Sequence, residues 1–183
     1  MSRLGPAAGS GPVAAPGTHV DDLPTPALVI DLDRMDENIR RVQSFAGRHG
    51  VALRPHAKTH RMVAVAHRQL AAGARGLTVA KVGEAEVMAE GGVGDLFIAN
   101  QIVAPGALAR LAALHGQVRL AVGVDHPRQA ELLAEALAAA GRRAGRRTQE
   151  PLDVMIEVDT GQGRCGVQPG EDAVALARAV SRL

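Results

Sequence analysis

Aromatic side chains are almost absent from this sequence, and their absence limits what the chain can bind. Its 183 residues include no tryptophan and no tyrosine, and Phe45 and Phe97 are the two phenylalanines. Proteins that bind single-stranded nucleic acids usually stack the bases on aromatic rings. The formal net charge is only +2, and the arginines between residues 142 and 147 are typical of a solvated loop. We therefore expect no nucleic-acid partner and a core of alanine, valine, leucine and isoleucine.

Cysteine and long apolar stretches are also scarce. Cys165 is the single cysteine, which excludes an internal disulfide framework and a cysteine-rich zinc site and favours a reducing compartment. No apolar run approaches the ~20 residues that a helix needs to span a bilayer. The first residues lack the basic and then apolar order of a signal peptide. The sequence predicts a cytoplasmic, soluble protein with no membrane partner.

The composition changes about 20 residues into the chain. Residues 1–20 consist largely of glycine, alanine and proline without periodicity. They bury too little apolar surface to offset the entropy of ordering the chain, so we expect a disordered tail. Residues 21–183 carry regular apolar patterns and have the length of one ordinary domain.

From residue 27 onward, short apolar runs alternate with longer segments of helical periodicity. The apolar runs predict buried strands, and the periodic segments, opened by proline or closed by glycine, predict helices. We expect Asp33 to cap the first helix. The expected strands are residues 27–31, 51–55, 77–80, 95–99, 118–124 and 153–159, and the expected helices are residues 33–48, 61–72, 84–90, 105–115, 127–140 and 172–183.

This alternation is typical of a parallel sheet covered by helices. A dinucleotide-binding fold is disfavoured, because no glycine fingerprint follows the first strand. Polar residues instead follow the strand ends, where barrel enzymes build their active sites. They are Lys58, Asn100, Gln101, Asp125, His126 and Asp159. We predict an α/β fold, a (β/α)8 TIM-type barrel that is incomplete because only about six strand–helix units are present.

The segment from Arg54 to His60 concentrates basic side chains after an apolar run. Alternation along a strand gives Arg54, His56 and Lys58 the same parity, so we expect them to face one region. Burial and nearby cations would lower the pKa of Lys58 and make its amine a nucleophile, with His56 tuning it or holding a bound ring. The alternative is an ordinary solvated loop. His56 and His60 have the spacing of a zinc pair on a helix, but the strand context argues against it.

A second segment, residues 156–167, runs from a strand into a loop with three glycines. The backbone N–H groups of such a loop could contact an anion, and Arg164 could hydrogen-bond a phenolate or a carboxylate. We expect Glu157 to hold Arg164 through an ion pair. A glycine-rich loop is also often only a turn, and Cys165 is more typical of a small buried residue than of a nucleophile.

Four motifs, taken together, carry a family resemblance. They are R-P-H-A-K-T-H (54–60), T-V-A-K-V-G-E-A-E-V-M-A (78–89), I-A-N-Q-I-V (98–103) and I-E-V-D-T-G-Q-G-R-C-G-V (156–167). In this order they resemble the D-threonine aldolase and D-serine dehydratase-like family, whose members are fold-type III pyridoxal 5'-phosphate (PLP) enzymes related to the alanine racemase N-terminal domain. The resemblance covers about residues 22–183 and implies a PLP-binding barrel of the alanine racemase N-terminal type.

The resemblance also implies roles for individual residues. Lys58 matches the catalytic lysine that forms a Schiff base with PLP. Arg164 matches the arginine near the phenolic oxygen of PLP, and Glu157 supplies negative charge where alanine racemases carry a carbamylated lysine. The expected cofactor-binding residues are Lys58, His56, Asn100, Gln101, Glu157 and Arg164.

The implied activity is that of a PLP-dependent lyase acting on small D-β-hydroxy-amino acids, of the D-threonine aldolase type. A D-serine dehydratase or an amino-acid racemase of the same fold is one alternative, and a non-catalytic PLP-binding or inactive truncated protein is another. In this family the phosphate-binding loops and the ligands of a divalent metal follow the part of the barrel seen in this sequence. We therefore expect an N-terminal fragment without metal ligands of its own. The resemblance also suggests a homodimer.

Overall fold

The computed structural model describes residues 14–144 and 151–183. It separates the chain after Met35 into two compact units, which are described one at a time. Residues 1–13 of the predicted disordered tail lie outside the described residues, and so do the arginines at 146 and 147 in the predicted solvated loop.

The strand expected over residues 27–31, in the first unit, is not formed, so this prediction was wrong. These residues follow a single turn of 3-10 helix (Val20–Asp22) and have no regular secondary structure. Leu28, Val29 and Ile30 are exposed. A strand needs a neighbour for its N–H and C=O groups. Within the described chain no ladder or bridge pairs residues 27–31 with another segment.

Helix α1 (Leu32–Arg48) crosses the boundary between the two units. Its first turn is capped by Asp31, whose Oδ1 accepts the backbone N–H of Arg34 at 3.0 Å. The prediction that Asp33 caps this helix was wrong, because the helix begins at Leu32 and Asp33 already lies in its first turn.

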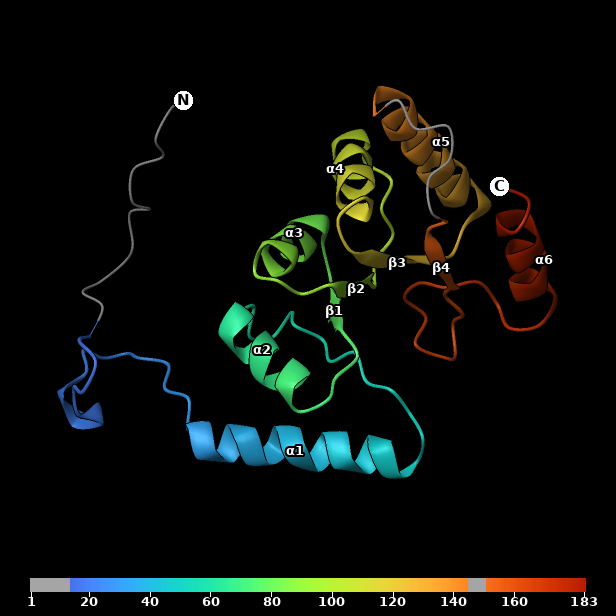
Figure 1. Cartoon of the computed structure of the whole chain (residues 1–183). Helices are drawn as coiled ribbons and strands as arrows, with labels where there is room; N and C mark the ends of the chain where they lie inside the picture. Colours follow the sequence, from blue (N-terminus) through green and yellow to red (C-terminus); the bar gives the residue numbers. More distant parts are fainter. Residues whose placement is uncertain (1–13, 145–150) are drawn as a thin grey trace. The chain divides into compact units, whose positions relative to one another are not determined.

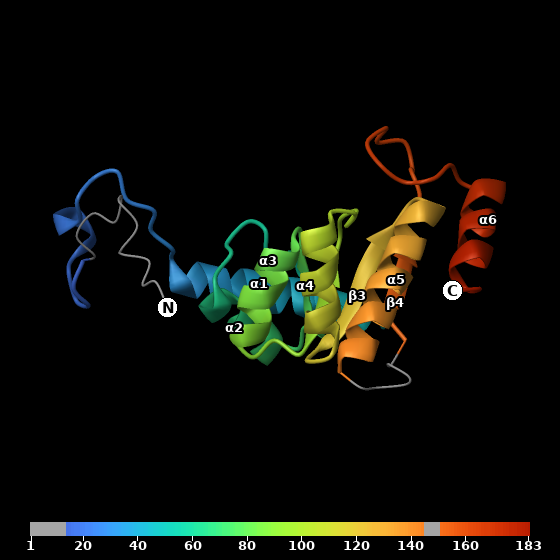
Figure 2. The ribbon, with the colours of Figure 1, turned by 90° about the horizontal axis from the view of Figure 1, so that it is seen from above.

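The second unit is built on a parallel four-stranded sheet in the order β1-β2-β3-β4 (Figure 1). A helix follows each strand, which confirms the α/β alternation predicted from the sequence. Helix α4 packs against α3 and α5, and Figure 2 shows these three helices side by side. The strands are β1 (Leu77–Val79), β2 (Asp95–Ile98), β3 (Arg119–Val124) and β4 (Asp153–Ile156), and the helices are α2 (Val63–Ala71), α3 (Val82–Glu90), α4 (Pro105–His115), α5 (Pro127–Arg143) and α6 (Glu171–Val180).

The predicted strand at residues 51–55 becomes a strand-like segment that extends the sheet beyond β1. The N–H of Thr78 donates to the carbonyl of Pro55 at 2.9 Å, and the N–H of Ala57 donates to the carbonyl of Thr78 at 2.8 Å. His56 therefore forms a parallel bridge with Thr78. Pro55 has no N–H to add to the ladder, which explains why the pairing is short. The described residues thus contain four strands and one strand-like segment, fewer than the six strands expected.

The core of the second unit is aliphatic, as the composition predicts. Alternate strand residues point under the helices, and the fully buried ones include Leu77, Leu96, Ile98, Leu120 and Val122. Each such side chain contributes about 1.5–3 kcal/mol relative to remaining exposed. The phenylalanines lie outside this core, with Phe45 58% exposed and Phe97 half-buried. Among the described residues, no helix is both long and apolar enough to cross a membrane.

Candidate functional site

The strands of the second unit all end at one side of the sheet, which we call the carboxyl edge. In a parallel sheet, residues that follow different strands meet at this edge. Lys58 follows the strand-like segment, and Asn100 with Gln101, Asp125 and Glu157 follow β2, β3 and β4. The sequence placed Lys58, Asn100, Gln101 and Asp125 after strands, and the structure has them at this edge. Glu157 was expected within the last strand, which ends one residue earlier, and the roles of these residues remain predictions.

A hydrogen-bonded group of polar side chains lies at the carboxyl edge. Nε2 of Gln101 donates to Oε2 of Glu157 at 2.5 Å and to Oδ2 of Asp125 at 3.0 Å, so one amide separates two carboxylates. The thiol of Cys165 donates to Oε1 of Glu157 at 2.9 Å. All four side chains are partly buried. Carboxylates held by two donors each are fixed in direction, so this group forms a rigid polar floor.

The predicted ion pair between Glu157 and Arg164 is not formed, and the expectation was wrong. Both oxygens of Glu157 are occupied by the donors from Gln101 and Cys165. Arg164 is exposed and, within residues 14–144 and 151–183, makes no hydrogen bond or ion pair. The guanidinium is thus free to meet a ligand from solvent.

The glycine-rich loop carries its own anion. The carboxylate of Asp159 accepts the backbone N–H groups of Gly161 and Gln162 at 2.9 Å and that of Gly163 at 3.1 Å. These bonds, first that of Gly163, hold the pKa of Asp159 below its ordinary value. The sequence left two interpretations of these N–H groups open, contact with a bound anion or an ordinary turn. The N–H groups are satisfied within the loop, which makes the loop a self-capped turn.

Lys58 is exposed and follows the fully buried Ala57. Its backbone N–H donates to Nδ1 of His56 at 3.2 Å. Burial, and after it the positive charge of Lys58, lower the pKa of His56 below 6.5. The half-buried imidazole is therefore neutral at neutral pH, and it lies beside the lysine as predicted.

Arg54 does not share the region of Lys58, so that expectation was wrong. Its guanidinium makes two hydrogen bonds with Asp95, at 2.7 and 3.1 Å, and Asp95 is the first residue of β2, at the opposite edge. Equal parity predicts the face of a strand but not the position along it. Four residues of extended chain separate two side chains by roughly 13 Å.

The remaining predicted residues have local partners. Nδ2 of Asn100 donates to the carbonyl of Ala80 at 2.9 Å, and its Oδ1 accepts the N–H of Gln101 at 2.9 Å, so Asn100 joins the ends of β1 and β2. Nδ1 of His60 accepts the N–H of Met62 at 3.1 Å. In the described part of the chain, three or more His, Cys, Asp or Glu side chains do not gather as they would around a metal ion.

Asp125 of the polar group and Gln129, which supports it from α5, were not selected from the sequence. Asp125 was noted at a strand end but was not predicted to belong to the site. Gln129 is 2% exposed and links β3 to α5: its Nε2 donates to the carbonyl of Gly123 at 2.8 Å, and its Oε1 accepts the N–H of Asp125 at 3.3 Å. A buried glutamine one helical turn after a strand-end aspartate is the signal that could have found this pair.

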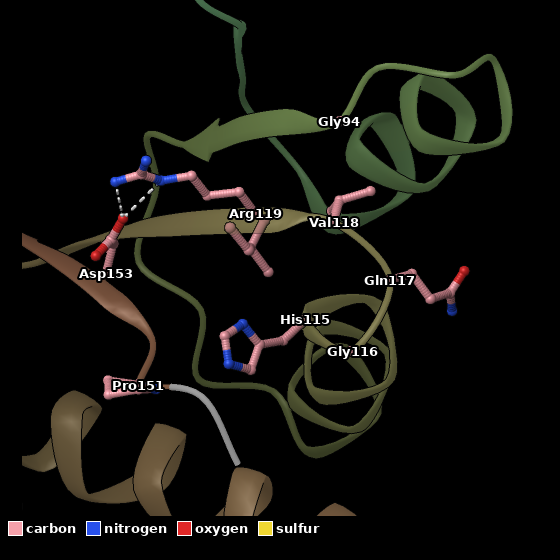
Figure 3. A pocket seen from close by; sticks show the side chains of 9 residues that line it. Gly94, His115, Gly116, Gln117, Val118, Arg119, Pro151 and Asp153 are labelled. Atoms are coloured by element: carbon pink, nitrogen blue, oxygen red, sulfur yellow. Dashed lines mark hydrogen bonds and ion pairs between the residues drawn. The ribbon is translucent and has the colours of Figure 1, made fainter.

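A hollow elsewhere on the molecule is unrelated to these residues. Figure 3 shows it at the amino ends of β3 and β4, where Arg119 and Asp153 pair at 3.1 Å beside His115. Because this hollow lies at the edge opposite to Lys58, we place the candidate site at the carboxyl edge.

Comparison with known proteins agrees with the fold and with the motifs. A family model described as "Alanine racemase, N-terminal domain" matches residues 30–183. A D-threonine aldolase from Arthrobacter sp is 42% identical over 168 residues, which are 92% of this chain and 42% of that protein. A D-threo-3-hydroxyaspartate dehydratase from Delftia sp. (strain HT23) is 42% identical over 161 residues, covering 87% of this chain and 40% of that protein.

A solved structure also agrees with the fold. The crystal structure of D-threonine aldolase from Filomicrobium marinum superposes with a TM-score of 0.83 at 42% identity, covering 89% of this chain and 42% of that one. The chain thus spans about two fifths of the length of these relatives.

Proposed function

The chain belongs to the family of the alanine racemase N-terminal domain, and on this premise we propose that it supplies the lysine-bearing domain of a PLP-dependent lyase. The proposed substrates are small D-β-hydroxy-amino acids, and the proposed reaction is the cleavage carried out by D-threonine aldolases. The observation that carries this proposal is the exposed amine of Lys58, set beside a neutral His56 at the edge where the polar group lies.

The described residues fit the ring end of PLP. An aldehyde requires an accessible primary amine, which Lys58 supplies. A phenolic oxygen requires a cationic donor, which the unpaired guanidinium of Arg164 supplies. The partly buried polar floor lies at the same edge. The glycine-rich loop does not offer a phosphate cradle, because Asp159 occupies its N–H groups. We therefore assign the ring end of the cofactor, and not its phosphate, to this chain.

Each residue has a proposed task. PLP, when bound, supplies an electron sink for the charge that develops at the substrate Cα. Lys58 would hold the cofactor through its amine, and the same amine would serve as an acid or base. Arg164 binds the phenolic oxygen, and Glu157, fixed by Gln101, keeps negative charge next to the loop. Asn100 maintains the joint between the ends of β1 and β2.

A dehydratase is the second candidate, because the Delftia relative that bears this name is as similar in sequence as the aldolase. A racemase of the same fold is a third candidate. An aldolase breaks the Cα–Cβ bond and releases glycine and an aldehyde, whereas a dehydratase removes the α-proton and the β-hydroxyl. The divalent metal implied by the resemblance would polarise that hydroxyl, and we propose that its ligands come from outside this chain. Homodimerisation and a cytoplasmic location are part of the same proposal.

The test is to trap PLP covalently on the 183-residue chain. Lys58 and Lys81 are the two lysines of the sequence, and both are exposed and lie after neighbouring segments of the sheet. PLP is added, the adduct is reduced with borohydride, and peptides are analysed by mass spectrometry. We expect the label on the peptide that contains Lys58, its loss in Lys58→Arg, and its retention in Lys81→Arg.

Both variants keep the positive charge, so the electrostatic attraction of the chain for PLP is the same in the two. Equal labelling of the two lysines would show nonspecific reaction, and labelling that survives in Lys58→Arg would overturn the assignment. A protein that carries this domain together with the metal ligands is then incubated with D-threonine: glycine and acetaldehyde indicate the aldolase, and an oxo acid with ammonia indicates the dehydratase.

A further inference from the structure

Glu157 contacts the glycine-rich loop through the thiol of Cys165, whereas Asp125 is the carboxylate of the polar group that accepts from the backbone of this loop. Its Oδ2 accepts the backbone N–H of Gly166 at 3.1 Å and, at 3.0 Å, the amide of Gln101. Asp125 follows β3, whereas Gly166 lies 41 residues later, at the end of the loop that carries Arg164. One side chain therefore connects the end of β3, Gln101 in the segment after β2, and the loop.

The backbone of Asp125 is itself held from the core. Its N–H donates to Oε1 of Gln129, and the Nε2 of Gln129 donates to the carbonyl of Gly123. Gln129 is 2% exposed, so water cannot compete for these bonds. The backbone of Asp125 is therefore fixed by the core, and this defines the position from which its carboxylate extends.

Gly166 can pack against the backbone of Val158 and Asp159, and so take its place in the loop, only because it is glycine. Its φ is +103°, and a Cβ at this position would come within 2.7 Å of the carbonyl carbon of Val158. Both the conformation and the contact exclude other residues. The loop is thus held at its far end by the bond of Gly166 to Asp125 and by the main-chain bridge between Val158 and Val167, and it is capped internally by Asp159.

Arg164 depends on this closure. It is exposed and has no side-chain partner in the part of the chain that the structure describes, so its direction is set by the loop backbone alone. We propose that Asp125 is a positioning residue: it fixes the loop of residues 160–166 to the carboxyl edge and thereby holds Arg164 where it meets the cofactor. This inference rests on the proposed function of the site.

The link between Asp125 and the loop is tested without any cofactor. Amide hydrogen exchange is measured on the 183-residue chain and on Asp125→Ala, Asp125→Asn and Asp153→Ala. We expect faster exchange at Gly166 in Asp125→Ala and an intermediate rate in Asp125→Asn, whose neutral oxygen still accepts a hydrogen bond. Asp153→Ala is the matched control, since it removes an exposed carboxylate at the opposite edge.

The link to Arg164 is tested by a double-mutant cycle in PLP affinity. We expect Asp125→Ala and Arg164→Ala each to weaken PLP binding by about tenfold, the equivalent of one charge-assisted hydrogen bond. The double variant is expected to bind no more weakly than Arg164→Ala alone, because Asp125 acts only through Arg164. The rest of the polar group is kept, since Gln101 retains its bond to Glu157. Partial recovery of affinity in Asp125→Asn would accompany the partial recovery of exchange protection.

The outcomes separate the two proposals. Unchanged exchange at Gly166 in Asp125→Ala overturns the positioning role, whether or not PLP binds. Additive losses in the double variant also overturn it, since Asp125 would then act independently of Arg164. Failure to label Lys58 overturns the proposed function, while the exchange measurement still decides the contact. If Asp125→Ala does not fold, Asp125→Asn supplies the comparison, because it keeps the shape of the side chain and one acceptor oxygen but loses the charge.

Discussion

Arg61 donates its Nε to the carbonyl oxygen of Lys58 at 3.2 Å from a left-handed backbone conformation, with φ at 51°. Its guanidinium also lies 3.5 Å from Oε1 of Glu84, whose side chain is 14% exposed. Oε2 of Glu84 accepts the N–H of Ala80, just after β1. The turn that carries Lys58 is thus tied to the end of the neighbouring strand. Strained backbone of this kind is typical of functional sites.

The left-handed conformation of Arg61 predicts an unusual order of stabilities. Arg61→Ala and Arg61→Gly both remove the guanidinium, but only glycine relieves the strained backbone. We therefore expect Arg61→Gly to have a higher free energy of unfolding than Arg61→Ala, by about 1 kcal/mol. Urea denaturation followed by circular dichroism measures this difference.

Arg68 provides the matched control, since it lies in α2 and also makes an ion pair, with Asp36 at 2.6 Å. In a helix interior glycine is less stable than alanine by about 1 kcal/mol, so the order of the two variants should reverse there. If the alanine variant were more stable than the glycine variant at both positions, the result would contradict a left-handed conformation of Arg61.

Asp95 is expected to stabilise the edge of the sheet opposite to Lys58. Its carboxylate is 15% exposed and contacts Arg54, which is 16% exposed, with Arg75 at 3.5 Å and Arg119 at 4.0 Å. Asp95→Ala leaves the half-buried guanidinium of Arg54 without its partner, which costs about 3 kcal/mol.

The double variant Arg54→Ala, Asp95→Ala should lose less than the sum of the two single variants, because the unpaired charge is removed as well. Chemical denaturation of the four proteins measures this coupling. Asp153→Ala breaks a pair in which both side chains are at least half exposed and is expected to cost less than ~1 kcal/mol. A larger loss in Asp153→Ala than in Asp95→Ala would refute this assignment.

Two histidines predict a loss of stability in weak acid. Burial, as the first cause in each case, lowers the pKa of His56 and of His60 below 6.5. The unfolded chain then binds protons that the folded chain does not, so stability is fully present above pH 6.5 and falls as the pH drops towards the folded-state pKa. We expect the urea midpoint to be lower at about pH 5.5 than at about pH 7.5.

His56→Gln and His60→Gln should each reduce this dependence on pH. The pKa of Asp159 is lowered from 3.8, so its contribution is lost only below that pH and does not overlap the measured range. A midpoint that is equally pH-dependent in the wild type and in the double histidine variant would argue against the two imidazoles as the cause.

The helices were predictable because their signals are local. Pro105 and Pro127 begin α4 and α5 where the sequence indicated, and α3 ends before Gly91. The strand at residues 27–31 was not predictable in this way. An apolar run identifies a segment that can pair, but the partner decides whether it does.

The candidate site was likewise predictable where its signals are local and not where distant residues decide. The sequence placed Lys58 and Gln101 at strand ends and Glu157 on the last strand, and the sheet brings these residues to one edge. The expected pair of Glu157 with Arg164 failed because Gln101, 56 residues earlier, supplies a competing donor. No pattern within the segment 156–167 contains that competitor.

The sequence by itself determined the alternation of strands and helices, the aliphatic core and the family, because these depend on periodicity, composition and short motifs. Only the tertiary structure decided how the hydrogen bonds are shared: Arg54 with Asp95, the loop amides with Asp159, and Gly166 with Asp125. A carboxylate accepts from whichever donors the fold brings within about 3 Å, and that proximity is a property of the folded sheet and not of the order of residues.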